Sequence, residues 1–249
     1  MLLSLFLRRK TAKTLFSQKH QKIIEIPLTF QYFCSIIIID LFLGGNMNRY
    51  DSLVRFFRPI IRFFFPFRVL NLPESLPEEG LVVCPNHISF FDPLFLAITL
   101  PRNITFMAKE ELFSRPIIGK WVKECGVIPL SRDGGDAAKL RQAVRELKAG
   151  KLFSLFPQGT RCRYPLKKED FKAGVGMMVA LSGAKMLPVG VYSKHYKVRL
   201  FRRTYLYFGE PVSLASEEKM GVKDQALYIT DRLFDEIARL EALAKEAAK

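Results

Sequence analysis

The 249-residue sequence is poor in the residues that form metal sites and disulfides, with only four cysteines and three histidines. The cysteines are Cys34, Cys84, Cys125 and Cys162. Their positions show none of the paired spacing that zinc sites use. Scattered thiols of this kind suit a reducing cytoplasm. We therefore expect no metal site.

Acidic residues are too few to balance the basic ones. The chain has 24 Asp and Glu against 39 Lys and Arg, a formal net charge of +15, so we expect an anionic partner. Nucleic acid is one candidate, because 22 phenylalanines could stack on bases. No recognised nucleic-acid-binding motif is present, however. The hydrophobic content of 49% excludes a disordered chain, and no repeat or low-complexity tract is evident.

An apolar stretch at residues 26–45 is nominally long enough to span a membrane, but a proline, a glutamine and an aspartate interrupt it. No convincing cleavage site marks a signal peptide. Residues 43–46, directly before Met47, resemble the in-frame translation of a bacterial ribosome-binding site. We expect residues 1–46 to be partly or wholly untranslated or unstructured. A native mass spectrum that includes the first residues would contradict a later start.

Residues 47–71 are rich in phenylalanine and arginine. At helical spacing Arg55, Arg58 and Arg62 share a face, while phenylalanine and isoleucine occupy the rest. Such a helix suits an anionic membrane interface, with arginines at the headgroups and phenylalanines at the acyl boundary. Two prolines limit its length, so we do not expect it to span. The alternative is a buried helix with a basic edge.

From residue 72 onwards strand and helix patterns alternate. We predict strands at residues 81–84, 152–156, 187–192 and 198–208, and helices from Leu94, over 137–149 and over 226–240. This alternation predicts an α/β fold, a single mixed-sheet domain over residues 72–249 preceded by the interfacial helical segment. The length is sufficient for one such core.

A strand-to-helix loop carries a candidate general base. Asp92-Pro93 has the form of a helix start, which places His87 in the loop after the strand at 81–84. If this loop folds back, Asp92 accepts a hydrogen bond from one imidazole nitrogen and leaves the other free as a base. The alternative is that Asp92 only caps its helix and His87 is an ordinary loop residue.

A candidate anion site, residues 156–161, follows the strand at 152–156. Arg161 provides a guanidinium that can hold a phosphate in a bidentate manner. Gly159 allows the backbone to approach a ligand closely. Cys162 adjoins this segment and is a weak candidate nucleophile.

The two motifs resemble those of the glycerolipid acyltransferases, specifically the 1-acyl-glycerol-3-phosphate acyltransferase family, whose first block is Asn-His-x4-Asp. The second matching block spans residues 106–132, with its matches at 106–113, Pro116, Gly119, Gly126 and 128–132. The third lies at residues 156–161 and the fourth at 187–189, and residues 205–212 fit the closing strand and turn. The order of the blocks makes coincidence implausible.

This resemblance implies acyl transfer from acyl-CoA or acyl-carrier protein to lysophosphatidic acid, giving phosphatidic acid, with no cofactor. His87 would take the hydroxyl proton and Asp92 would hold and polarise it. The substrate-binding residues that it implies are Lys109, Arg132, Gln158, Gly159, Thr160 and Arg161. Lys109 as a solvated lysine, and Arg132 as a surface ion pair with Asp133, are the simpler alternatives.

Two positions depart from the family pattern. Gln158 stands where the third block usually has glutamate, which loses a charge and gains a donor. If that carboxylate orients Arg161 or a substrate hydroxyl in relatives, the change bears on the identity of the acceptor. Gly190 stands where the fourth block often has proline, which we interpret as local backbone variation.

These features together predict a peripheral enzyme on the cytoplasmic face of the bacterial inner membrane. Three alternatives remain: an acyltransferase of the same fold that acts on another lysolipid, a non-catalytic membrane-binding protein, and a basic nucleic-acid binder. The intact His87, Asp92 and Arg161 argue against the second.

Overall fold

The computed structural model describes residues 49–249, apart from residues 117, 125 and 131–136. The predicted segment 1–46 and the predicted site residue Arg132 therefore lie outside the described part of the chain. The described helices are α3 (Arg49–Phe64), α4 (Asp92–Thr99), α5 (Ile118–Glu124), α6 (Ala137–Lys148), α7 (Gly174–Ser182) and α8 (Val222–Glu246), with short 3-10 turns η1 (Glu110–Leu112), η2 (Lys168–Asp170) and η3 (Lys194–Tyr196). The strands are β1 (Phe67–Leu70), β2 (Leu81–Pro85), β3 (Ile104–Lys109), β4 (Ile128–Leu130), β5 (Leu152–Ser154), β6 (Lys185–Ser193) and β7 (Thr204–Phe208).

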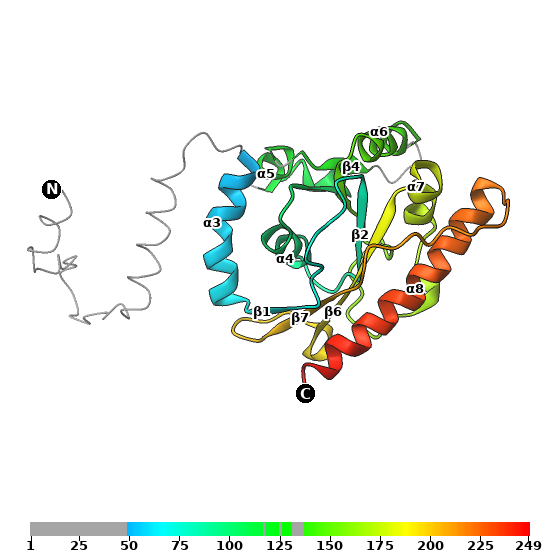
Figure 1. The fold of residues 1–249 in the computed structure, drawn as a ribbon. Helices are drawn as coiled ribbons and strands as arrows, with labels where there is room; N and C mark the ends of the chain where they lie inside the picture. Colours follow the sequence, from blue (N-terminus) through cyan, green and yellow to red (C-terminus); the bar gives the residue numbers. More distant parts are fainter. Residues whose placement is uncertain (1–48, 117, 125, 131–136) are drawn as a thin grey trace, which may run out of the picture.

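The strands form one seven-stranded sheet in the order β1-β7-β6-β2-β5-β3-β4. All neighbours run parallel except β6 and β7, which are antiparallel. The sheet is therefore mixed, and helices cover both of its faces (Figure 1). This confirms the predicted α/β fold with a single mixed sheet.

The two faces of the sheet carry separate cores, because successive side chains of a strand point in opposite directions. In β2, Leu81 and Val83 belong to the core shared with α3 and α4, whereas Val82 and Cys84 belong to the core shared with α6, α7 and α8. All four side chains are fully buried. Burial on both faces explains why this strand has an unbroken apolar sequence.

Helix α3 packs onto the domain through Ile61, which is 3% exposed and joins the core beside α4. The Arg58 guanidinium also donates to the carbonyl of Ile98 at 3.2 Å. The helix ends before the predicted segment does, and residues 67–70 form the edge strand β1, because Pro66 lacks the N–H that would continue the helix. Among the described helices none has the length and apolar content needed to cross a bilayer.

Helix α8 lies across β6, and the contact requires glycine at the crossing point. A Cβ on Gly190 would lie 2.2 Å from the backbone nitrogen of Glu241 in α8. Gly176 likewise allows α7 to approach α8 closely, since a Cβ there would lie 2.0 Å from the carbonyl oxygen of Ala226. The interpretation of Gly190 as mere backbone variation is therefore wrong, because glycine permits close approach of the helix.

The predicted strand at 198–208 is too long. The strand β7 begins only at Thr204, because Phe201 has a φ of 58°, which no extended strand contains. The residues between β6 and β7 form an exposed connection instead. Strand β5 likewise ends at Ser154, two residues before the predicted end.

Candidate active site

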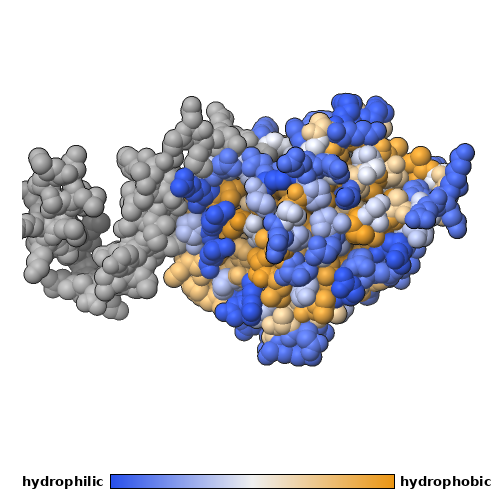
Figure 2. Space-filling view, in the orientation of Figure 1, coloured by the Kyte–Doolittle hydropathy of each residue, from blue (hydrophilic) through white to orange (hydrophobic). Residues whose placement is uncertain are grey.

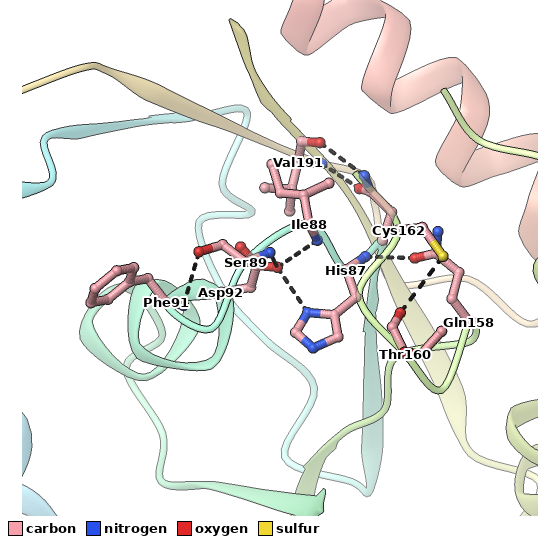
Figure 3. Close-up of polar contacts among 10 residues, drawn as sticks. His87, Ile88, Ser89, Phe91, Asp92, Gln158, Thr160, Cys162 and Val191 are labelled. Carbon is pink, nitrogen blue, oxygen red and sulfur yellow. Dashed lines mark hydrogen bonds and ion pairs between the residues drawn. The ribbon is translucent and has the colours of Figure 1, made fainter. Parts of the chain in front are cut away.

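The imidazole of His87 lies against the carboxylate of Asp92, with Nδ1 and Oδ2 2.9 Å apart (Figure 3). The Asp92 side chain is 1% exposed and that of His87 is 16% exposed. An ionised carboxylate only accepts hydrogen bonds, so Nδ1 carries the hydrogen and Nε2 has a free lone pair. The loop therefore holds a histidine oriented to act as a base.

The loop folds back because Asp92 binds its backbone. Oδ2 accepts hydrogen bonds from the backbone N–H groups of Ile88 at 2.8 Å and Ser89 at 2.7 Å. Helix α4 begins at Asp92 itself, and Phe91 occupies the N-cap position without a side-chain cap. The predicted N-cap role of Asp92 is wrong, because its carboxylate serves the residues before it rather than the helix N–H groups after it.

Burial dominates the electrostatics of Asp92. Desolvation raises the pKa of its carboxyl, and the hydrogen bonds from His87, Ser89 and Ile88 oppose that rise. The second oxygen, Oδ1, has no hydrogen-bond partner among the described residues. The ionised form therefore depends on the contacts that the folded loop makes with Oδ2.

The loop at residues 156–162 forms hydrogen bonds with the backbone of His87. Gln158 Oε1 accepts a hydrogen bond from the His87 N–H at 2.6 Å (Figure 3). The His87 carbonyl accepts one from the Cys162 N–H at 2.8 Å. Gln158 is 1% exposed, and its Nε2 has no partner among the described residues. Its side chain thus lies beneath His87, where it positions that residue.

Asn86 attaches the same loop to the sheet. Its side-chain Nδ2 donates to the Val191 carbonyl at 2.9 Å, and its Oδ1 accepts from the Val191 N–H at 2.6 Å. This amide continues the pairing of β2 with β6 where Pro85 has no N–H to offer. The sequence signal was the asparagine directly after a strand-ending proline, but its partner strand could not be read from the sequence.

Phe156 lies beside the catalytic candidate, with its ring centroid 4.0 Å from that of His87 at an angle of 32°. The ring packs against the imidazole and limits its rotation. This role was not predicted, because an aromatic residue after a strand is indistinguishable in sequence from a core residue.

The predicted cations follow strands that end at one edge of the sheet. Strand β5 pairs with both β2 and β3 in parallel, so the His87 loop, the 156–161 loop and Lys109 emerge together. Strand β4 ends at the same edge, since its last residue, Leu130, pairs with Lys109. Lys109 and Arg161 are exposed, and neither forms an ion pair in the described part of the chain.

The turn at Gly159 brings an unpredicted lysine near the site. Gly159 has a φ of 64°, a conformation that favours glycine, and it is exposed together with Thr160. The Lys172 Nζ lies 3.5 Å from the position that a Gly159 Cβ would occupy, and the Lys172 N–H donates to the Pro157 carbonyl at 2.9 Å. Lys172 therefore lies against the loop at residues 156–161.

An apolar cleft of about 490 Å³ opens beside this loop. It is lined mainly by apolar side chains of the β3, β5 and α7 regions, among them Met107, Leu155, Phe156, Met177 and Met178. Phe156 borders the cleft and also packs on His87. An extended apolar group in the cleft would thus have one end near the imidazole. Among the described residues no group of acidic, His or Cys side chains could hold a metal ion.

Comparison with known proteins places the chain among acyl-transferring enzymes. A family model described as Acyltransferase matches residues 68–192. The chain is 26% identical over 174 residues to a 1-acyl-sn-glycerol-3-phosphate acyltransferase of Streptococcus pneumoniae, covering 68% of this chain and 63% of that protein. It is 28% identical over 174 residues to the protein of the same name in Bacillus subtilis, covering 68% of this chain and 85% of that one.

The fold is also found in a solved structure. The crystal structure of the 1-acyl-sn-glycerophosphate acyltransferase from Thermotoga maritima superimposes with a TM-score of 0.54 at 22% identity. The match covers 82% of this chain and 88% of that one. The two proteins therefore share an architecture over most of their length.

Proposed function

The chain belongs to the acyltransferase family, and we propose that it transfers a fatty acyl group from acyl-CoA or acyl-carrier protein to the sn-2 hydroxyl of lysophosphatidic acid, giving phosphatidic acid. The observation that carries the proposal is the His87–Asp92 pair at 2.9 Å beside an anion loop. The names of the Streptococcus and Bacillus relatives support the same acceptor.

The reaction needs one base and no enzyme nucleophile. His87 Nε2 takes the proton of the acceptor hydroxyl while that oxygen attacks the thioester carbonyl. The new C–O bond forms, the C–S bond then breaks, and the departing sulfur receives the proton from His87. Asp92 stabilises the imidazolium that exists between these steps. General base catalysis of this kind contributes roughly 10²- to 10⁴-fold in rate.

The acceptor phosphate would bind at the sheet edge. Arg161 offers two parallel N–H donors to a phosphate, while Lys109 and Lys172 act as point charges. Arg132 is proposed as a further cation on the strength of its position in the matched sequence. Gly159 and Thr160 form the turn that lets the backbone approach the phosphate. Gln158, because it is buried, contributes by holding His87.

The acyl chain of the donor would occupy the apolar cleft. Its lining is largely apolar, and its edge at Phe156 adjoins His87, which is where the thioester carbonyl must lie. Flexible methionine side chains in the lining suit chains of more than one length. The basic surface suits either donor, because both CoA and an acidic carrier protein bear negative charge.

The enzyme would work as a peripheral protein at an anionic membrane, on the cytoplasmic face of the bacterial inner membrane. The arginines and phenylalanines of α3 support this, since such a helix binds headgroups and the acyl boundary together.

The test is a panel of acceptors with the purified protein. Lysophosphatidic acid, lysophosphatidylglycerol and lysophosphatidylethanolamine are each supplied with acyl-CoA and with acyl-carrier protein, and products are identified by mass spectrometry. We expect phosphatidic acid to form fastest. Faster acylation of another lysolipid would transfer the assignment to that acceptor, and no acylation at all would contradict an enzymatic role.

A further inference from the structure

The connection between β6 and β7 exposes two large apolar side chains. Leu200 is 56% exposed and Phe201 is 64% exposed. A single exposed apolar residue is ordinary on a soluble protein, but two adjacent ones at the end of a loop form a protrusion that water disfavours. This part of the chain was predicted as a strand, in which alternate side chains would be buried.

Phe201 is held in its exposed position by the end of α3. Its backbone N–H donates to the Phe64 carbonyl at 2.7 Å, and its ring contacts those of Phe63 and Phe64, each with centroids 5.9 Å apart. Its φ of 58° is uncommon for a bulky residue and persists only where surrounding contacts fix it. These contacts fix the loop with the Phe201 side chain exposed. Phe63, which is 42% exposed, extends the apolar surface.

The sequence on both sides of these side chains is basic. Residues 194–209 contain no acidic residue, and neither do residues 52–73 of α3 and β1. The exposed cations next to the apolar pair in sequence or on the adjoining helix end are Arg62, Lys197, Arg199, Arg202 and Arg203. In Figure 2 the lower left edge of the domain, where the end of α3 meets the β6–β7 connection in Figure 1, shows apolar surface bordered by hydrophilic surface.

Aromatic contacts link this edge to the catalytic loop. Phe65, directly after α3, stacks on Phe91 with ring centroids 3.9 Å apart, and Phe91 contacts Phe90 at 6.2 Å. Phe90 lies three residues after His87 and is 47% exposed. The loop that carries His87 is therefore connected to this edge through packed aromatic rings.

We propose that Leu200 and Phe201 insert into the acyl region of an anionic bilayer while the surrounding arginines bind its headgroups. Exposed apolar side chains with cations next to them in the sequence match this boundary, because the headgroups there are negatively charged and the acyl region beneath them is apolar. The inference rests on the proposed membrane association and adds a second contact element to α3. It also orients the domain, with the end of α3 and the β6–β7 connection toward the lipid.

The first test measures binding of the full chain to phosphatidylglycerol vesicles by co-sedimentation. The Leu200→Ser/Phe201→Ser double variant should lose at least about tenfold in partitioning, because burying one leucine or phenylalanine corresponds to a factor of that size. A matched control is Leu227→Ser/Tyr228→Ser, an adjacent pair that is 57% and 39% exposed near the start of α8, at the opposite end of the domain (Figure 1). Equal loss in both variants, or none in either, would overturn the proposal.

The second test reports insertion directly and does not rely on a variant with reduced membrane binding. The only tryptophan of the chain, Trp121, is replaced by phenylalanine, and Phe201→Trp is introduced. With phosphatidylglycerol vesicles the emission should shift to the blue and be quenched by brominated acyl chains, and phosphatidylcholine vesicles should give a much smaller response. Bound protein whose emission neither shifts nor is quenched would contradict insertion.

Acyl transfer is measured separately with a short-chain lysophosphatidic acid that stays monomeric in water. The Leu200→Ser/Phe201→Ser variant should keep its activity in this assay although it binds vesicles weakly. If the unaltered protein inserts into vesicles but acylates nothing, the proposed function fails and the membrane contact stands. If it acylates the soluble acceptor but does not insert, only the membrane contact fails.

Discussion

The positions of individual atoms around His87 account for most of what the site can do. Its ring is fixed by Asp92 and Phe156, and its backbone N–H and carbonyl are both bound by the 156–162 loop. A base must be held in place to take a proton from a bound substrate, since small displacements cost large factors in rate. Asp92 thus orients the imidazole of His87, Gln158 binds its backbone N–H, and Asn86 attaches the loop to the sheet.

Gln158 can be tested as a positioning residue. Replacement by methionine removes the acceptor of the His87 N–H and leaves that buried donor unpaired, which costs about 1–3 kcal/mol. We expect kcat to fall about tenfold or more while KM for the acceptor changes little. Gln142→Met, on helix α6, is the control and should leave both unchanged. An unaltered kcat in Gln158→Met would contradict the positioning role.

Gln158→Glu addresses the departure from the family pattern. A carboxylate can still accept the His87 N–H bond, so activity should stay within a few-fold of the parent about equally for every lysolipid tested. The measurement is kcat/KM for the acceptor panel. A change in which lysolipid is preferred would mean that residue 158 contacts the acceptor after all.

Arg161 should bind the phosphate of the acceptor. Its replacement by alanine removes a charge-assisted hydrogen bond worth about 1.5–3 kcal/mol, so kcat/KM for lysophosphatidic acid should fall about 10- to 100-fold, largely through KM. Arg163→Ala, which changes another exposed arginine two residues further on, should have little effect. If the two variants behave alike, Arg161 has no specific role in binding.

The crossing of α8 over β6 leaves no room for a side chain at Gly190. Alanine at Gly190 would place a methyl group 2.2 Å from the α8 backbone, and overpacking of this kind costs about 1–3 kcal/mol. We expect a Tm several degrees lower. Gly174→Ala is the control, because a Cβ there meets nothing within 4 Å. A Gly190→Ala variant with the Tm of the parent would contradict the close approach.

Glu241 makes the same element sensitive to pH. Burial raises the pKa of its carboxyl, while Tyr196 and Lys245 partly oppose the rise. The folded protein then holds this proton more tightly than the unfolded chain, whose glutamates titrate near about 4.3. Stability should therefore fall as the pH rises from that value through the raised pKa.

Replacing this carboxyl with an amide should remove its share of the pH dependence. The Tm of Glu241→Gln should decrease less than that of the parent between pH 4 and pH 8, whereas Glu246→Gln, an exposed residue of the same helix, should follow the parent. Parallel Tm curves for Glu241→Gln and the parent would show that Glu241 does not titrate in this range.

The elements themselves were largely predictable, because hydrophobic periodicity marks β2, α6 and α8 directly. The β6–β7 connection was not. Val198 to Phe208 has the composition of a strand, and only tertiary contacts to α3 force Phe201 into its left-handed conformation. The start of α4 was predicted wrongly for a similar reason. Asp92 is a residue type that often caps helices, but its carboxylate accepts hydrogen bonds from the preceding loop.

Across the whole molecule, the order of the strands in the sheet determines which motifs lie close together. Residues 87 and 158 are far apart in sequence, yet β2 and β5 are neighbours and bring them together. Their association was predicted from the family resemblance, whereas the contact itself required the topology. The role of Gln158 could not be predicted from the sequence. Its place in the third block suggested a substrate contact, whereas the structure shows it buried and hydrogen-bonded to the His87 N–H.

We propose that His87 acts as the base of an acyl transfer to lysophosphatidic acid. The most direct measurement is the initial rate of phosphatidic acid formation by the parent and by His87→Ala, with thermal unfolding used to verify that both are folded. We predict a rate at least about 10²-fold lower in the variant, the contribution of a positioned base. Equal rates in two folded proteins would show that His87 is not the base.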